Sequence, residues 1–278
     1  MTQKTIVISE IGENHMGNFD LAYRMIEESA AAGADMVKFQ SYCGADVCDT
    51  DPEKEWFSQV QVSDEMHFRL KHHAEQCGVE FLSSPFSVGR ARFLCEKLGM
   101  KKIKIASSQM LCQPMLDYVN EHADTVFLST GMATLEEIRE ATQHLERVKS
   151  LCLLQCTTQY PTRAADANLA VIATLSQEFP RCRIGYSDHT CGILAPIVAV
   201  ALGAEVIEKH FTLDKTLPGT DHVLSAEPAE LKEMIRQIRE VELLLGSAIK
   251  QPTSQEQEIV SRVRSRFAGV PAWPNGNL

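Results

Sequence analysis

Short runs of β-branched and other apolar residues alternate along the chain with longer amphipathic stretches. Eight such runs predict strands, at Thr5–Ile11, Asp35–Gln40, Glu80–Ser84, Lys102–Ser107, Thr125–Thr130, Leu151–Thr157, Arg183–Asp188 and Glu205–Thr212. The stretches between them predict helices, for example at Phe19–Ala32, Glu65–Cys77, Leu135–Val148 and Ala229–Leu245. Strands that alternate with helices indicate a parallel sheet with right-handed crossovers.

The number of repeats favours a closed barrel over an open sheet. Eight units match a (β/α)8 TIM barrel, and 278 residues suit a single domain of this kind. Gly33, Gly78 and Gly203 lie just before predicted strands, where they are expected to end helices. No Gly-x-Gly-x-x-Gly follows the first strand, which disfavours a dinucleotide-binding fold. We expect an α/β barrel over residues 1–250 and a C-terminal tail over residues 251–278.

Composition and charge narrow the class of partner. Hydrophobic residues make up 44% of the chain, as in ordinary globular proteins. The net charge of −10 disfavours nucleic acid and anionic membranes as partners. The N-terminus has no signal-peptide pattern, and no apolar run reaches transmembrane length. The nine cysteines form no CxxC pair and are interpreted as reduced thiols, so we expect a cytoplasmic protein.

Polar residues gather where the predicted strands end, which in a barrel is the active-site side. Lys38 and Lys104 stand inside apolar strands, and strand alternation directs both side chains into the barrel. A buried lysine is costly without an anionic neighbour. Two explanations stay open: a carboxylate on a neighbouring strand, or an anionic ligand such as a phosphate or carboxylate. Hydroxyl donors for a ligand would come from Ser84, Ser107, Ser129 and Ser187.

Two histidines end neighbouring strands and can converge on one ion. His189 follows the seventh strand, and His210 lies at the end of the eighth. Neutral imidazole is a common ligand of Mn²⁺, Fe²⁺ and Zn²⁺. A lone barrel histidine would more often be a hydrogen-bonded polar residue, but Asp188, Glu208 and Asp221 stand close to this pair. The sequence therefore predicts a two-histidine metal site.

Eight short motifs stand in order at these strand ends. They are Glu10–Gly17, Val37–Gln40, Ser83–Ser87, Lys104–Ser107, Leu128–Met132, Cys156–Thr162, Gly185–Thr190 and Glu208–Thr212. Together they resemble the barrel domain of the N-acetylneuraminate (sialic acid) synthase family, which includes legionaminic and pseudaminic acid synthases. Each motif alone is weak evidence, whereas eight in order are specific.

The resemblance implies a reaction and a set of site residues. Such enzymes condense phosphoenolpyruvate with an open-chain N-acetylated aldose by C–O cleavage, giving a 2-keto sugar acid and phosphate. By the resemblance, His189 and His210 would hold Mn²⁺, or else Mg²⁺ or Co²⁺, as a Lewis acid for the aldehyde. Phosphoenolpyruvate would contact Lys38, Ser84, Lys104, Ser107, Ser129 and Ser187. The sugar would face Glu10, Gln40, Thr158, Tyr160 and Asp221. The candidates for catalysis are Glu10, Lys38, Lys104 and Asp221.

The sequence departs from the family pattern at four places. Gln109 stands where many members have an acid, and glutamine cannot exchange a proton. Thr158 replaces an asparagine, and Ser41–Val62 is short and lacks a sugar-contacting asparagine. The family usually continues into an antifreeze-like domain that lends an arginine to the partner subunit. Here Arg264–Phe267 resembles the start of the linker, so we expect a vestigial linker over 251–278 and an altered sugar side.

Three hypotheses about function follow. The leading one is a metal-dependent synthase that uses phosphoenolpyruvate and a small aldose similar to N-acetylmannosamine. The second is a metal-dependent aldolase or lyase that acts on a keto acid and releases no phosphate. The third is a non-catalytic or lid-dependent binding homologue, motivated by Gln109 and the expected lack of the C-terminal domain. A homodimer through the barrel helices is compatible with each.

Overall fold

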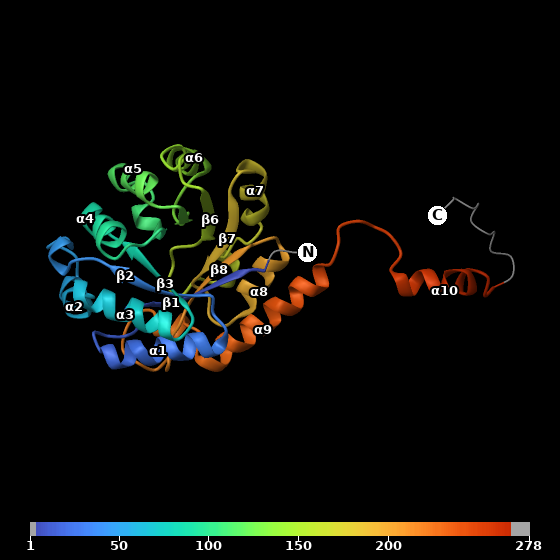
Figure 1. Cartoon of the computed structure of the whole chain (residues 1–278), viewed down its shortest axis with the longest axis horizontal. Helices are drawn as coiled ribbons and strands as arrows, with labels where there is room; N and C mark the ends of the chain where they lie inside the picture. Colours follow the sequence, from blue (N-terminus) through green and yellow to red (C-terminus); the bar gives the residue numbers. More distant parts are fainter. Residues whose placement is uncertain (1–3, 268–278) are drawn as a thin grey trace. The chain divides into compact units, whose positions relative to one another are not determined.

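The computed structural model describes residues 4–267, and its centre is a ring of eight parallel strands (Figure 1). The strands are β1 (Ile6–Gly12), β2 (Met36–Ser41), β3 (Glu80–Pro85), β4 (Lys102–Ile105), β5 (Thr125–Ser129), β6 (Ser150–Cys156), β7 (Arg183–Asp188) and β8 (Val206–His210). Their order in the sheet is β3-β2-β1-β8-β7-β6-β5-β4. The two terminal strands of this order, β3 and β4, lie next to each other. The sheet is therefore a nearly closed barrel, and the predicted (β/α)8 fold is confirmed.

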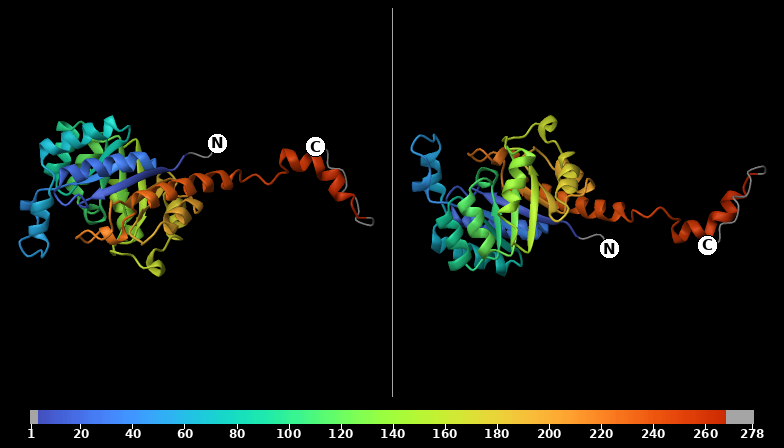
Figure 2. Two further views of the ribbon diagram at one scale, coloured as in Figure 1. Left: turned by 90° about the horizontal axis from the view of Figure 1, so that it is seen from below. Right: turned by 90° about the horizontal axis from the view of Figure 1, so that it is seen from above.

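Helices connect the strands, and most of them pack around the outside of the barrel (Figures 1 and 2). They are α1 (Phe19–Ala32), α2 (Lys54–Val60), α3 (Asp64–Gln76), α4 (Val88–Arg92), α5 (Gln113–His122), α6 (Leu135–Gln143), α7 (Val171–Glu178), α8 (Leu194–Ala201), α9 (Pro228–Leu245) and α10 (Ser254–Arg264). Short helical turns are η1 (Gly44–Asp46), η2 (Phe93–Lys97), η3 (Ser107–Gln109), η4 (Ala164–Asp166) and η5 (His222–Leu224). None of the helices described is long and apolar enough to cross a membrane.

Local sequence signals account for the bounds of α1, which match the prediction. The Asn18 side chain accepts a hydrogen bond from the Leu21 amide at the start of the helix. Gly33 ends the helix in the left-handed region at φ +94°, which favours glycine. Met25 and Ile26 are buried against the strands. The helix thus buries one face between two defined caps.

Several predicted elements are shorter in the structure, among them β8, which spans Val206–His210 instead of Glu205–Thr212. The helix predicted over Leu135–Val148 ends at Gln143, because the Leu145 amide bonds to the Thr142 carbonyl and tightens the chain into a turn. The fourth strand ends at Ile105 instead of Ser107, because the chain then turns into η3. Ser107 consequently lies in the η3 turn above the barrel.

Within the described residues, the barrel unit spans 4–244, and a second unit begins at Leu245. Helix α10 lies in this second unit, in a stretch that the sequence indicated only as polar. Thr253 and Glu256 form a capping box at its start, which satisfies amides that the first helical turn leaves free. Residues 268–278, which complete the predicted vestigial linker, lie outside the described range.

Candidate active site

Every strand contributes one inward-facing polar side chain near its C-terminal end. In chain order these are Glu10, Lys38, Ser84, Lys104, Ser129, Cys156, Ser187 and Glu208. They line a cavity of about 410 Å³ at the mouth of the barrel. One layer below, strand alternation places an apolar floor of buried side chains: Ile8, Leu82, Phe127, Leu154 and Val206. This floor keeps water away from the lower side of the polar layer.

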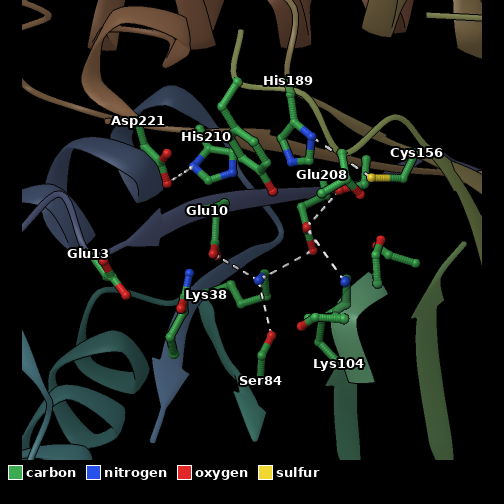
Figure 3. A pocket seen from close by; sticks show the side chains of 18 of the residues that line it. Glu10, Glu13, Lys38, Ser84, Lys104, Cys156, His189, Glu208, His210 and Asp221 are labelled. Carbon is green, nitrogen blue, oxygen red and sulfur yellow. Dashed lines mark hydrogen bonds and ion pairs between the residues drawn. The ribbon is translucent and has the colours of Figure 1, made fainter. Parts of the chain in front are cut away.

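Carboxylates inside the barrel lie beside both buried lysines (Figure 3). The Lys38 Nζ atom lies 2.9 Å from Glu10 Oε1 and 3.8 Å from Glu208 Oε2. It also donates a 3.1 Å hydrogen bond to Ser84 Oγ. The Lys104 Nζ atom lies 3.8 Å from Glu208 Oε1. A carboxylate on a neighbouring strand therefore accounts for Lys38, whereas the carboxylate beside Lys104 lies on β8, which is not next to β4 in the sheet.

The surroundings of the two carboxylates in this layer, Glu10 and Glu208, shift their pKa values in opposite directions. Burial raises the pKa of Glu10, although the charge of Lys38 opposes this effect. Burial would also raise the pKa of Glu208, but the charges of Lys104 and Lys38 outweigh it and lower this pKa. Glu208 is thus a fixed negative charge, whereas Glu10 can gain or lose a proton closer to neutral pH.

Hydroxyl groups from three strand ends converge near the loop after β5. The Gly131 amide donates a 3.0 Å hydrogen bond to Ser107 Oγ. A Cβ atom at Gly131 would lie 2.3 Å from Thr158 Oγ1 and 2.7 Å from Ser107 Oγ, so only glycine fits there. The Ser129 hydroxyl is buried and has no hydrogen-bond partner among the described residues. It is free to donate to a ligand in the cavity.

The two histidines face each other above this layer, with ring centroids 5.2 Å apart. The Nδ1 atom of His189 lies 2.8 Å from the Thr157 carbonyl, which only accepts, so Nδ1 carries the proton and Nε2 is free. The Nδ1 atom of His210 lies 3.4 Å from Asp221 Oδ2. The Tyr160 ring covers His189 at a centroid distance of 4.1 Å. The Nε2 atom of His189 is therefore available to bind a ligand.

These donors fit a divalent ion in an open site. Burial and the neighbouring His189 keep the pKa of His210 well below its usual range, so its imidazole is neutral, the form that binds metals. Burial lowers the pKa of His189 too, but the nearby Cys156 thiol outweighs it and raises this pKa. The described residues form no cluster of three or more metal-binding side chains. Water and substrate would therefore supply the remaining ligands of an ion.

Asp188 does not join this site. Its carboxylate is fully buried behind the strands and pairs with Lys209 Nζ at 2.6 Å. The Tyr186 hydroxyl donates a further hydrogen bond of 2.9 Å to it. Asp188 is therefore a structural partner of the strand ends that carry the histidines.

Comparison with known proteins identifies the family. The model of the NeuB family matches residues 25–250. The chain belongs to the NeuB family. It is 40% identical to the N,N'-diacetyllegionaminic acid synthase of Campylobacter jejuni, over 99% of this chain and 88% of that protein. It is 36% identical to the human N-acetylneuraminate-9-phosphate synthase, over 98% and 80%. The crystal structure of a Leptospira borgpetersenii sialic acid synthetase in complex with citrate has a TM-score of 0.88 and 34% identity, covering 95% of this chain and 93% of that one.

The structure brings all thirteen residues predicted for a NeuB-family site to the one cavity. They are Glu10, Lys38, Gln40, Ser84, Lys104, Ser107, Ser129, Thr158, Tyr160, Ser187, His189, His210 and Asp221. Gln109, which we expected on the sugar side, is not among the described residues that line it. The turn of η3 directs Ser108 into the cavity instead.

Several lining residues of this NeuB-family chain were not predicted as site residues. They are Glu13, Glu53, Phe57, Phe86, Ala106, Ser108, Cys156, Glu208 and Thr220. Glu13, Cys156 and Glu208 belong to the quoted motifs, so their strand-end position was a usable signal. Glu53 and Phe57 come from the segment Ser41–Val62. Its sequence offered no reason to expect site residues there, because it was notable only for being short and lacking an asparagine.

Glu13 is anchored from outside the barrel. The Trp56 indole of α2 donates a 3.0 Å hydrogen bond to Glu13 Oε2. Burial raises the pKa of Glu13 to about 7, with smaller upward contributions from Asp221 and Glu53, while the Trp56 bond lowers it. The bond ties α2 to the end of β1 and fixes a carboxyl group at the cavity wall.

Proposed function

We propose that this chain catalyses the metal-dependent condensation of phosphoenolpyruvate with an open-chain aldose similar to N-acetylmannosamine. The products are a sialic-acid-like 2-keto sugar acid and inorganic phosphate. The observation that carries the proposal is the pair of buried lysines beside the two facing histidines in one cavity. Family membership supports it, since the named relatives are synthases of sialic-acid-type sugars.

The lysines and hydroxyls form the proposed phosphoenolpyruvate side. Glu10 and Glu208 now neutralise Lys38 and Lys104, and the charged groups of phosphoenolpyruvate would take over part of this role. The unpartnered hydroxyl of Ser129 would donate to the ligand. The other proposed donors to this ligand are Ser84, Ser107 and Ser187. An anionic substrate at this position would explain why two lysines lie in a cavity with an apolar floor.

The balanced reaction needs one proton at the sugar oxygen and one water at C2 of phosphoenolpyruvate. A C–C bond forms between C3 of phosphoenolpyruvate and the aldehyde carbon, and the C2–O bond to phosphate breaks. Glu10 is the proposed proton carrier, because burial raises its pKa and Lys38 holds it in place. Asp221 is the second candidate for this role.

His189 and His210 are the proposed holders of the metal, with Mn²⁺ preferred over Mg²⁺ or Co²⁺. The ion, when bound, would supply a Lewis acid that polarises the aldehyde. Tyr160 lies against the His189 ring and shields it from solvent on that face. Gln40 and Thr158 complete the proposed sugar side.

Phosphate release tests this function. The purified chain is incubated with phosphoenolpyruvate, Mn²⁺ and a panel of aldoses, and phosphate and 2-keto acid are quantified. The proposal predicts equal amounts of both products with at least one aldose. No aldose-dependent phosphate with Mn²⁺, Mg²⁺ or Co²⁺ would overturn it. In a separate assay without phosphoenolpyruvate, cleavage of a 2-keto sugar acid to pyruvate and an aldose would indicate the keto-acid aldolase instead. Borohydride trapping of an imine on Lys38 or Lys104 would show that such an aldolase works through a Schiff base.

A further inference from the structure

We propose that Glu13, Glu53 and Asp221 select an aldose that carries no phosphate or other anionic group. These three residues, which we call the acidic wall, line the same cavity as the lysines. The inference rests on the proposed function and names the class of its second substrate. It assigns a specificity role to Glu13 and Glu53, neither of which was predicted as a site residue.

The acidic wall and the proposed phosphoenolpyruvate side, formed by Lys38, Lys104 and the hydroxyl groups, occupy different parts of the cavity. Figure 3 shows Glu13 and Asp221 on one side and Lys104 and Cys156 on the opposite side, with Lys38 between them. Phosphoenolpyruvate at the lysines would therefore leave the acidic wall to the far part of the sugar. Glu53 immediately precedes α2 and lines the same cavity, which places it at this wall.

The charges along the cavity oppose an anionic sugar. Among the described lining residues, Lys38 and Lys104 are the only lysine or arginine side chains, and carboxylates already neutralise both. A phosphate on the sugar would face Glu13, Glu53 and Asp221 without a cation of its own. Like charges brought together in a binding site are strongly unfavourable, and Glu13, whose pKa is about 7, adds its charge above that pH. The cavity thus disfavours a phosphorylated aldose before any contact with the metal site.

Hydrogen-bonding capacity independently favours an aldose without an anionic group. The Oε2 atom of Glu10 is buried and has no hydrogen-bond partner among the described residues. Glu10 lines the cavity, and its side chain is only 2% exposed. Sugar hydroxyl and amide groups donate hydrogen bonds, whereas a phosphate dianion only accepts them. A neutral, hydroxyl-rich aldose satisfies this oxygen.

Paired substrates test the inference. N-acetylmannosamine and its 6-phosphate, or whichever aldose turns over and its phosphate ester, are compared at saturating phosphoenolpyruvate. We expect kcat/KM for the unphosphorylated sugar to be higher by at least about tenfold. Glu53→Lys should reduce this ratio by about tenfold. Glu55→Lys makes the same charge change at an exposed position of α2 that does not line the cavity, and should leave the ratio unchanged.

The failures of the two proposals are distinguishable. A wild-type preference for the phosphorylated sugar, or equal effects of Glu53→Lys and Glu55→Lys, would overturn the inference while the synthase function stands. Absence of turnover would overturn the proposed function instead. In that case the two sugars are titrated calorimetrically into the protein with phosphoenolpyruvate. Weaker binding of the phosphorylated sugar supports the acidic wall, and equal or tighter binding contradicts it.

Discussion

Lys209 and Asp188 form a fully buried salt bridge of 2.6 Å that ties β8 to β7. Asp188 directly precedes His189, and Lys209 directly precedes His210. The pair lies behind the strands, because alternation directs the neighbouring Glu208 into the barrel. It therefore fixes the distance between the two strand ends that present the histidines.

Removing one member of this pair should destabilise the fold strongly. Lys209→Met leaves the Asp188 carboxylate buried without a cation, and we expect a loss of about 3–5 kcal/mol in the free energy of unfolding. Urea denaturation measures this loss. Lys71→Met is the matched control, because Lys71 forms a solvent-exposed pair with Glu75 and should cost less than about 1 kcal/mol. A similar small loss for both variants would contradict the structural role of the buried pair.

The fold was predictable because its signals are local. Alternation of apolar residues located all eight strands, and the bounds of α1 follow from its cap residues. Helix α10 was missed although Thr253 and Glu256 stand at capping-box spacing, since the segment has few apolar residues to show helical periodicity. Short, polar helices escape a method that depends on a hydrophobic face.

Site residues could be predicted where the sequence fixes the direction of the side chain, and were missed where it does not. Lys38 and Lys104 lie within strands, where the period of two fixes which side chains point inward. Gln109 and Glu13 lie beyond the regular strands, in a helical turn and in a loop, so their directions depend on local geometry. Glu53 depends on how α2 docks through Trp56, a contact between segments that are distant in sequence. Such contacts become visible only in the folded chain.

If His189 and His210 hold the metal, both histidines are needed for activity. His189→Ala should lower phosphate release by at least about a hundredfold and weaken Mn²⁺ binding, because one imidazole ligand is lost. Chelation of the wild type should abolish activity, and added Mn²⁺ should restore it. Calorimetric titration of Mn²⁺ measures binding independently of turnover. His72→Ala, at an exposed position of α3, is the control. Unchanged Mn²⁺ affinity in His189→Ala would count against this site.

Use of phosphoenolpyruvate should depend on Lys104 much more than on Lys102, which lies in the same strand. Lys104→Met removes a buried cation from the cavity, and we expect kcat/KM for phosphoenolpyruvate to fall by about a hundredfold, in line with the loss of a buried charge partner. Lys102→Met is the matched control, because Lys102 pairs with Glu80 at the surface. Steady-state kinetics with varied phosphoenolpyruvate separates the two. Equal effects would show that Lys104 does not bind the substrate.

Glu13 should make stability depend on pH. Its pKa rises from 4.5 to about 7 on folding, chiefly through burial, so the folded state binds the proton more tightly than the unfolded state. The resulting stabilisation is fully present below pH 4.5 and is lost as the pH rises through 7. Glu13→Gln removes this dependence and keeps an acceptor for the Trp56 indole. Relative to wild type, the variant should therefore gain about 1–2 kcal/mol between pH 5 and pH 8, after allowance for solvent screening of a partly exposed group.

Urea denaturation at the two pH values measures this gain in the free energy of unfolding. Glu65→Gln, at an exposed position of α3, controls for the loss of a carboxylate as such. A difference between Glu13→Gln and wild type that is the same at both pH values would show that Glu13 is already ionised in the folded protein at pH 5. The carboxyl group would then be stabilised by the cavity rather than strained by it, and its neighbours Asp221 and Glu53 would repel it less than their positions imply.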